Sequence, residues 1–432
     1  MGSYYADFHI HSRFARATSK NLTLPLLDEF ARKKGIKLLG TGDFTHPLWL
    51  AEIEHYLTPA PEKGLFILKD AAGDNPTRFI LSVEISSIYR QGDRGRRIHT
   101  IIMLPTLEAA TAFNDMLSTH GAKLSSDGRP ITGLSAKRLA ELAFSAHPQA
   151  LVIPAHAWTP WFSVFGSMSG FDSLEECFEE LTPKILAIET GLSSDPPMNW
   201  RLSQLDNVAL ISSSDAHSAA KIGREAVKFD GDLSYSAIAD ALRGAAPSRA
   251  GQRSASPTKL LGTIEFFPQE GKYHFDGHSA HNVRLSPAET KQNKGLCPNC
   301  GRRVTVGVLS RVEELADRPA NFKPAGAPDY WSLVPLEEII AEALGVQTGT
   351  KKVSAQYESL IQTFGDELTI LLDTPIKSIE AASTPAIAEA VRRVRAGQLH
   401  IEPGYDGEYG TVHVFSDEER LAPSSSEQVT LF

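Results

Sequence analysis

Short apolar runs alternate with helix-period stretches over the first half of this 432-residue chain. The runs cover residues 4–10, 37–42, 79–86, 99–104, 151–155, 185–190 and 208–212. Between most of them lie helical patterns, for example at 25–34, 47–56, 107–117 and 134–144. Strands that are joined mainly by helices pair in parallel. We therefore expect an α/β fold whose seven strands, in roughly 230 residues, form a closed or nearly closed β/α barrel.

The composition is that of an ordinary globular chain. Hydrophobic residues make up 42% and charged residues 22%, which excludes disorder, collagen-like repeats and coiled coil as the main state. No apolar run approaches the roughly 20 residues of a membrane helix, and the N-terminus lacks the layout of a secretory signal. We therefore expect a cytoplasmic protein with no membrane partner. The net charge of −9 argues against a uniformly basic coat, but a local basic groove is compatible with it.

The character of the chain changes near residue 250. Residues 265–307 are rich in Gly, His, Cys and turn residues, as in a small domain without a core of its own. A Pro-rich linker at 319–328 precedes three helical patterns, at 335–344, 353–364 and 384–396. The expected domains are a barrel over 1–253, a small Cys/His domain over 254–318, a helical domain over 319–415 and a flexible tail over 416–432.

Histidine and acidic residues recur near the ends of the expected strands. They are Asp7, His9, His11, Asp43, His46, Glu84, His99, His156, Glu189, Asp215 and His217. The C-terminal ends of barrel strands converge on one face, so these side chains would share one cleft. A lone His at such a position is more often an ordinary core or surface residue, but this many are not expected there by chance.

Imidazole and carboxylate ligands together suit Zn, Mn, Mg or Fe. The set exceeds the needs of one ion, which predicts two or three ions with Glu84 as a bridge. Asp7 and Glu189 are less secure as ligands, because either could orient a ligand His from behind.

Several stretches of the chain resemble known families. One set of residues resembles the motifs of the polymerase and histidinol phosphatase (PHP) superfamily of metal-dependent phosphoesterases. The set is Asp7-Phe-His9-Ile-His11, Asp43-Phe-Thr-His46, Glu84, His99, His156 and Asp215-Ala-His217. Over nearly its whole length the chain also resembles the endonuclease Q family. The resembling stretches are 9–18, 156–162, 270–278, 311–316 and 403–410. The resemblance implies a PHP-type distorted (β/α)7 barrel with a small zinc-binding domain and a C-terminal helical domain.

The same resemblance implies a DNA-repair endonuclease. It would nick 5′ of deaminated bases (uracil, hypoxanthine or xanthine) and of abasic sites, leaving 3′-hydroxyl and 5′-phosphate ends. A phosphodiester is anionic and repels hydroxide, so its hydrolysis needs a nucleophile generated in place and cations on the phosphate. A metal ion lowers the pKa of bound water towards about 7, and ions roughly 4 Å apart can stabilise both the attacking and the leaving oxygen.

Nine side chains are assigned as metal ligands on this basis: His9, His11, Asp43, His46, Glu84, His99, His156, Asp215 and His217. Glu84, His156 and Asp215 are the ones expected to be catalytic. The spacing of Asp43 and His46 is looser than in much of the superfamily, so it stays open whether both bind metal.

A second set of candidate ligands lies in the small domain. Cys297-Pro-Asn-Cys300 has the spacing of a zinc knuckle, and His278-Ser-Ala-His281 lies upstream. Two ligands from each pair would make a tetrahedral structural zinc site, which explains how so small a segment folds. His274 is a competing ligand, and chance spacing is the alternative. Three cysteines in the chain cannot supply a disulfide framework.

Arginine and tryptophan side chains near the expected cleft are candidates for DNA binding. They are Arg13, Arg16, Arg96, Arg97, Arg224, Trp158 and Trp161. The arginines could hold phosphate oxygens, which position DNA without reading its sequence. The tryptophans follow a ligand His in a Gly/Ser/Pro-rich loop and could stack on an extruded base. Solvated arginines and core tryptophans are the alternatives.

The chain ends with Gln428-Val-Thr-Leu431-Phe432 after a Ser-rich spacer. This terminal peptide resembles the bacterial peptides that bind the β sliding clamp, in which Gln sets the register and Leu-Phe fills a hydrophobic pocket. Gln428, Leu431 and Phe432 are therefore expected to bind that clamp, which would raise the concentration of the protein at DNA.

Two other functions are compatible with parts of the sequence. A small-molecule PHP phosphatase of the histidinol-phosphate type would use the same barrel, but it would leave the zinc domain, the helical domain and the tail peptide without a role. A clamp-tethered, non-catalytic DNA-binding adaptor would not need an intact ligand set. The favoured expectation is a monomeric, nucleoid-associated endonuclease that acts on double-stranded DNA with deaminated or abasic lesions.

Overall fold

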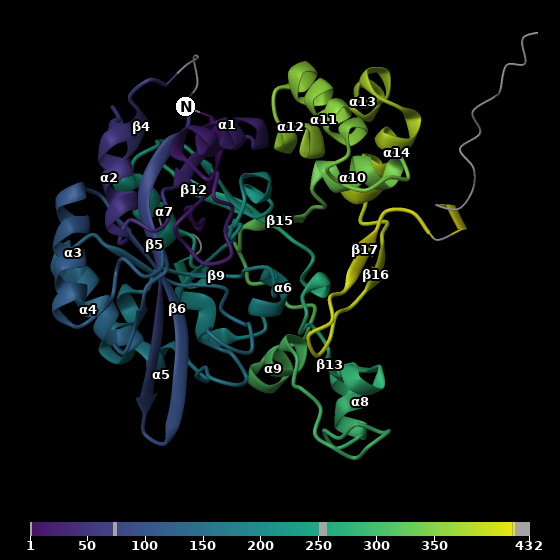
Figure 1. The fold of residues 1–432 in the computed structure, drawn as a ribbon. Coiled ribbons are helices and arrows are strands. Elements are labelled where there is room, and N and C mark those ends of the chain that lie inside the picture. Colours follow the sequence, from purple (N-terminus) through teal and green to yellow (C-terminus); the bar gives the residue numbers. More distant parts are fainter. Residues whose placement is uncertain (1, 72–75, 250–256, 417, 420–432) are drawn as a thin grey trace, which may run out of the picture. The chain divides into compact units, whose positions relative to one another are not determined.

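The computed structural model describes residues 2–71, 76–249, 257–416 and 418–419 (Figure 1). The chain divides into two compact units. One comprises Met1–Ser332 with Pro403–Gly410, and the other comprises Leu333–Glu402 with Thr411–Phe432. None of the helices in the described ranges is both long and apolar enough to cross a membrane.

The first unit is built on a mixed sheet that has eleven strands within the described residues. They are β1 (Ser3–Asp7), β2 (Ile36–Gly40), β3 (Leu57–Pro59), β4 (Phe66–Leu68), β5 (Arg78–Gln91), β6 (Arg94–Leu104), β7 (Ile131–Thr132), β8 (Leu151–Pro154), β11 (Ala226–Asp230), β12 (Lys259–Glu265) and β15 (Asp329–Ser332). Their order is β15-β12-β11-β1-β2-β5-β4-β3, and β6 lies between β5 and β8. A separate parallel pair consists of β9 (Ala187–Glu189) and β10 (Ala209–Ile211).

The α/β class agrees with the expectation from the sequence, but the all-parallel arrangement is wrong. β1 pairs in parallel with β2, and β2 with β5, whereas β5 and β6 form a long antiparallel hairpin. The hairpin turns at Gly92-Asp93, between the paired residues Gln91 and Arg94, and Gly92 has a φ of 58°. A two-residue loop of this kind joins antiparallel strands, so no helix separates the two runs.

Helices pack on the sheet, and most of them lie where the sequence has helical hydrophobic periodicity. They are α1 (Leu24–Lys34), α2 (Pro47–Tyr56), α3 (Leu107–Thr119), α4 (Ala136–Ala146), α5 (Leu174–Phe178), α6 (Pro196–Asn199) and α7 (Tyr235–Gly244). Thr23, Thr106, Ser135 and Ser234 cap four of them, because each hydroxyl accepts a hydrogen bond from a backbone N–H of the first turn. Helices α3 and α4 contact each other and pack against β6.

One hydrophobic core lies beneath the strand ends. Phe8, Ile80, Ile101 and Ile153 belong to it, and so does Ile211 from β10. The separate pair β9–β10 therefore shares a core with the strands of the large sheet, although it is not hydrogen-bonded to them in the described residues. This core fixes the strand ends from which the site residues project.

The Cys/His segment belongs to the first unit. It contains the hairpin β13 (Asp276–His278) and β14 (Val283–Leu285), followed by α8 (Pro287–Gln292) and α9 (Val308–Leu315). Its apolar cluster is only Val283, Leu285, Cys297 and Val304. Such a small core agrees with the expectation that the segment needs other support.

The second unit is mainly helical, as the sequence predicts for its middle part. It contains α10 (Leu336–Ala343), α11 (Lys351–Phe364), α12 (Glu367–Leu372), α13 (Ile376–Ala382), α14 (Pro385–Arg395) and the hairpin of β16 (His400–Glu402) and β17 (Thr411–His413). Thr384 caps α14 and Pro385 opens it. The expected helical domain starts at residue 319, but 329–332 form β15 at the edge of the large sheet, and 403–410 belong to the first unit.

Candidate metal centre and active site

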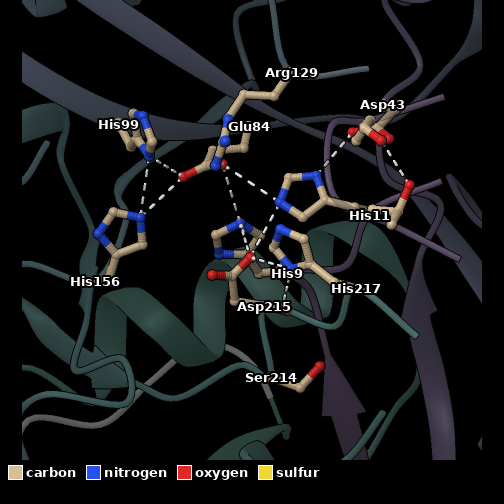
Figure 2. A network of polar contacts seen from close by, with 12 residues as sticks. His9, His11, Asp43, Glu84, His99, Arg129, His156, Ser214, Asp215 and His217 are labelled. Atoms are coloured by element: carbon tan, nitrogen blue, oxygen red, sulfur yellow. Dashed lines mark hydrogen bonds and ion pairs between the residues drawn. The ribbon is translucent and has the colours of Figure 1, made fainter. Parts of the chain in front are cut away.

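Seven of the nine predicted ligands gather in one cluster (Figure 2), although Glu84 and His99 lie within the long strands β5 and β6 rather than at strand ends. The members are His9 and His11 after β1, Glu84 in β5, His99 in β6, His156 after β8, and Asp215 and His217 after β10. Their donor atoms form three overlapping sets, within each of which all atoms lie within 4.8 Å of one another. The sets are His9 with His11 and Glu84, His11 with Asp215 and His217, and Glu84 with His99 and His156.

Glu84 lies at the centre of the cluster. Its Oε1 is 2.6 Å from His99 Nδ1 and 3.0 Å from His156 Nε2. Its Oε2 is 3.5 Å from His11 Nε2 and 3.6 Å from His9 Nε2. Each carboxylate oxygen thus faces a different pair of imidazoles, which is the arrangement a bridging ligand requires. Figure 2 shows the two pairs on opposite sides of the carboxylate.

The second carboxylate of the cluster is Asp215. Its Oδ1 lies 3.0 Å from His11 Nε2, 3.5 Å from His9 Nε2 and 3.6 Å from His217 Nδ1. Burial raises the pKa of this carboxyl, but His9 and His11 outweigh burial and hold the pKa below its ordinary value. The group therefore keeps a negative charge in the cluster, as a metal ligand must.

The donor set fits divalent metal ions. His9 Nε2 is buried and has no hydrogen-bond partner in the described part of the chain, which is costly for a polar nitrogen unless something else binds it. Burial raises the pKa of Glu84, but the neighbouring His99 and His9 hold it well below its ordinary value. Burial lowers the pKa of His99 to about 4, which leaves a neutral imidazole able to donate a lone pair to a cation.

Three further carboxylates lie next to the cluster and bind its histidines or the backbone beside it. Glu189 Oε2 is 3.1 Å from His9 Nδ1 and accepts a hydrogen bond from the backbone N–H of His156 at 2.8 Å. Asp43 Oδ1 is 3.1 Å from His11 Nδ1. Asp7 accepts hydrogen bonds from the backbone N–H groups of Ser214 and Gly223, outside the three sets. Glu189 and Asp43 thereby fix the ring orientation of two ligand histidines.

Three site residues have left-handed backbone conformations. Asp43, His156 and Asp215 have φ angles of 47°, 28° and 46°. Non-glycine residues rarely adopt positive φ, and Asp, Asn and His tolerate it best. The sharp turn after each strand directs His156 and Asp215 into the cluster and Asp43 toward the ring of His11.

His46 lies apart from the three sets. Its ring stacks on Phe14 at 4.4 Å between centroids, with an interplanar angle of 15°. Asp43 contacts one cluster member, His11, and it also accepts a hydrogen bond from the backbone N–H of Ser12. The structure therefore places this pair around the site, which matches the loose spacing of the motif.

Arg129 is a site residue that the sequence analysis did not identify. Its Nη1 is 3.0 Å from Glu84 Oε2 (Figure 2). It lies in the loop between α3 and β7, where neither hydrophobic periodicity nor a ligand motif marks it. Its proximity to Glu84 becomes visible only when β7 pairs with β5.

The four predicted zinc ligands converge in the Cys/His segment. His278 Nδ1 lies 3.4 Å from Cys300 Sγ, and His281 Nδ1 lies 3.6 Å from Cys297 Sγ. All four donor atoms lie within 4.8 Å of one another, as in a tetrahedral site. The competing residue His274 is buried outside this set, its ring stacked on Phe275.

The predicted DNA contacts separate into buried and accessible side chains. Trp158 is 0% exposed and its Nε1 donates a hydrogen bond to Asn199, so it cannot stack on an extruded base and that prediction is wrong. Arg96 is also buried: it donates to the carbonyl of Gly170 and lies 3.8 Å above the ring of Phe171. Its predicted contact with DNA is wrong for the same reason.

The other candidates retain some access to solvent. Arg16 and Arg97 are exposed, and Trp161 is half-buried edge-on against Tyr273. Two more have protein partners, because Arg13 pairs with Glu52 at 2.5 Å and Arg224 donates to the carbonyl of Ser214 at 2.9 Å. These five stay predictions for DNA binding.

Sequence relatives extend over both units. The chain is 30% identical over 428 residues to the protein YqxK of Bacillus subtilis, covering 95% of this chain and 100% of that one. It is 32% identical over 259 residues to MJ0043 of Methanocaldococcus jannaschii, covering 60% of this chain but only 31% of that longer protein. The family described as the MJ0043 C-terminal domain matches residues 335–398.

Two solved structures match from end to end. The lesion-specific endonuclease PfuEndoQ from Pyrococcus furiosus has a TM-score of 0.82 and 30% identity, and the match covers 100% of this chain and 99% of that one. Endonuclease Q in complex with a 27-mer duplex substrate, with an abasic lesion at the active site, has a TM-score of 0.82 and 31% identity, covering 99% and 100%. Fold and site together define a metal-dependent phosphoesterase. The chain belongs to the endonuclease Q family.

Proposed function

We infer that this chain is a lesion-specific DNA endonuclease. It hydrolyses the phosphodiester 5′ of deaminated bases and abasic sites in duplex DNA. The observation that carries the inference is the end-to-end match with Endonuclease Q, whose solved complex holds an abasic lesion at the active site. The cluster of three ligand sets around Glu84 supplies the matching chemistry in this chain.

We propose that the cluster holds two or three divalent ions and that the Cys/His segment holds one structural zinc. Bound divalent ions would supply a water of lowered pKa as nucleophile and positive charge for the phosphate oxygens. Glu84 and Asp215 provide the negative charge that holds the ions, and Glu84 spans two of the ligand sets. Glu189 and Asp43 keep His9 and His11 in the orientation that ligation needs.

The finer architecture is also proposed. The β9–β10 pair and the large sheet share a core, which supports a distorted PHP-type (β/α)7 barrel over 1–253. The converged Cys and His side chains support a zinc domain over 254–318, followed by the helical domain over 319–415 and the tail over 416–432. A monomer that works in the cytoplasm at the nucleoid fits a DNA substrate.

The function can be tested with purified protein, Mn²⁺ or Mg²⁺, and end-labelled duplexes carrying uracil, hypoxanthine, xanthine or an abasic site. We expect a single nick directly 5′ of each lesion, with 3′-hydroxyl and 5′-phosphate ends. An undamaged duplex should be cleaved much more slowly, since a damaged pair opens more easily. Release of free base, or equal cleavage of undamaged DNA, would contradict the proposal.

The same experiment distinguishes the two alternatives. A histidinol-phosphate-type phosphatase would release phosphate from small monoesters and leave the duplexes intact. A non-catalytic adaptor would bind the lesion duplex without cleaving it at any metal concentration.

We further propose that the terminal peptide binds the bacterial β sliding clamp. Gln428, Leu431 and Phe432 lie outside the described residues, so the proposal rests on the peptide sequence. A short peptide that orders on binding loses entropy, so we expect micromolar affinity, about −8 kcal/mol.

Deletion of Leu431 and Phe432 should abolish clamp binding in a fluorescence-polarisation or calorimetric titration. Cleavage of short lesion duplexes should be unchanged, because the metal ligands lie elsewhere. Native clamp affinity in the truncated protein would contradict the proposal.

A further inference from the structure

Arg129 places a permanent positive charge next to Glu84, at the centre of the cluster of candidate ligands. Its Nη1 is 3.0 Å from Glu84 Oε2, and its side chain is 26% exposed. The guanidinium therefore contacts the Glu84 carboxylate, and part of the Arg129 side chain is accessible from solvent. Neighbouring arginines have other protein partners: Arg13 pairs with Glu52, and Arg224 donates to a backbone carbonyl.

The backbone around Arg129 is docked onto the loop that carries His11. Gly128 donates its N–H to the carbonyl of Phe14 at 3.0 Å. Asp127 Oδ1 accepts hydrogen bonds from the backbone N–H groups of Arg129 at 3.1 Å and Arg16 at 3.2 Å. Two of these hydrogen bonds, from Gly128 to Phe14 and from Arg16 to Asp127, join the loop of Arg129 to the loop of His11, and the third fixes the turn before Arg129.

Gly128 allows this approach because it lacks a side chain. A Cβ at this position would lie 2.3 Å from Asp43 Oδ2 and 2.9 Å from the backbone nitrogen of Ala15. On the other side, the carbonyl of Pro130 accepts a hydrogen bond from Ser86, two residues beyond Glu84 on β5. Arg129 is therefore anchored from both sides at a set distance from Glu84.

The ion pair with Glu84 leaves the guanidinium with donors to spare. Arginine has five N–H donors in a planar fork that matches two phosphate oxygens, and it remains charged at any working pH. Glu84 Oε2 also faces His9 and His11, so a cation held there would compete with Arg129 for the same oxygen. An anionic phosphodiester arriving from solvent would be the complementary partner for the released guanidinium.

We propose that Arg129 is a catalytic residue that leaves Glu84 and binds the scissile phosphate when the centre is loaded. Its side chain holds the non-bridging oxygens and stabilises the negative charge that develops on them during hydrolysis. This inference rests on the proposed endonuclease function, and it adds a charge from the protein to those of the ions.

Kinetics of two variants test the role. Arg129→Ala should lower kcat for a lesion duplex about 100- to 1000-fold, as for removal of a preorganised donor to a developing charge. Arg129→Lys keeps the charge but lacks the planar fork, so we expect a smaller loss, of roughly 10-fold. The matched control is Arg138→Ala, which removes an exposed arginine paired within α4 to Glu141 and should leave kcat unchanged.

Binding measurements separate a phosphate contact from support of Glu84. Mn²⁺ binding to full-length Arg129→Ala should be as tight as in the wild type or tighter, because a competitor for Glu84 is removed. The slope of log Kd against log salt for lesion duplex should fall by about 1 in Arg129→Ala and stay unchanged in Arg138→Ala. Wild-type kcat, an unchanged slope, or weaker Mn²⁺ binding with lower thermal stability in Arg129→Ala would overturn the inference.

The Mn²⁺-binding and salt-slope outcomes, unlike kcat, are independent of whether the proposed function holds. If wild-type protein binds Mn²⁺ and duplex DNA without cleaving it, the endonuclease proposal fails. The salt slopes of the two arginine variants then still decide whether Arg129 contacts phosphate.

Discussion

Asp215→Asn is expected to reduce cleavage of a uracil-containing duplex by roughly 10³-fold or more, the scale on which a preorganised charged group contributes. The substitution removes the negative charge that faces His9 and His11 at 3.5 and 3.0 Å. It keeps the size of the side chain, and Asn tolerates the φ of 46° at this position. The loss should therefore come from the metal centre rather than from the fold.

Three measurements check this explanation. Single-turnover cleavage should fall, and metal analysis should show fewer than the wild-type number of ions in the cluster, while the thermal unfolding midpoint should stay within a few degrees. Asp240→Asn makes the same chemical change on α7, where Asp240 pairs with Arg243, and it should behave as the wild type. Turnover at the wild-type rate in Asp215→Asn would mean that the cluster is not the active site.

Cys297→Ser is expected to release the proposed structural zinc and to unfold the segment between β13 and α9. The apolar cluster there contains only Val283, Leu285 and Val304 besides Cys297 itself. Structural zinc contributes on the order of 10 kcal/mol to the folding of such small domains, whereas three buried aliphatic side chains supply roughly 5–9 kcal/mol at most. Losing one thiolate ligand should therefore remove most of that stabilisation.

The expected signature is the loss of one zinc per chain together with new sites of limited proteolysis within residues 276–308. Cys177→Ala is the matched control, since it removes a buried thiol from α5 and should leave the zinc content unchanged. Full zinc occupancy and unchanged protease resistance in Cys297→Ser would show that the four side chains converge without binding zinc.

Hydrophobic periodicity predicted where most strands and helices lie, but not how all the strands pair. The run 79–86 is the buried part of the longer strand β5, and the run 99–104 is the buried part of β6. The exposed ends of both strands carry Arg and Gln, and together with the turn residue Asp93 they resemble a charged loop in sequence. Gly92-Asp93 is a two-residue hairpin signal, and in the sequence it was obscured by the basic run around it.

The candidate site was predicted largely from residue type and position at strand ends, and the structure groups seven of those side chains. Whether each remaining side chain reaches the cluster depends on distances that the sequence does not show. His46 follows β2 as the motif suggests, yet its ring stacks on Phe14 instead of joining the cluster. The sequence alone does not predict this stacking. Arg129 reaches Glu84 through pairing between β5 and the two-residue strand β7, which is too short to leave a pattern in the sequence.

The left-handed turns at His156 and Asp215 limit how this centre can change through mutation. Side chains that tolerate positive φ are mainly Gly, Asn, Asp and His. Two of these four, Asp and His, are also good ligands for divalent metals, so the backbone and the metal favour the same few residues. Replacement by Glu or Cys would keep a ligand atom but strain the turn, whereas Asn or Gly would keep the turn and lose the ligand. A lineage could therefore exchange Asp and His at these positions with little backbone strain, while most other routes to a new metal preference would first destabilise the strand ends.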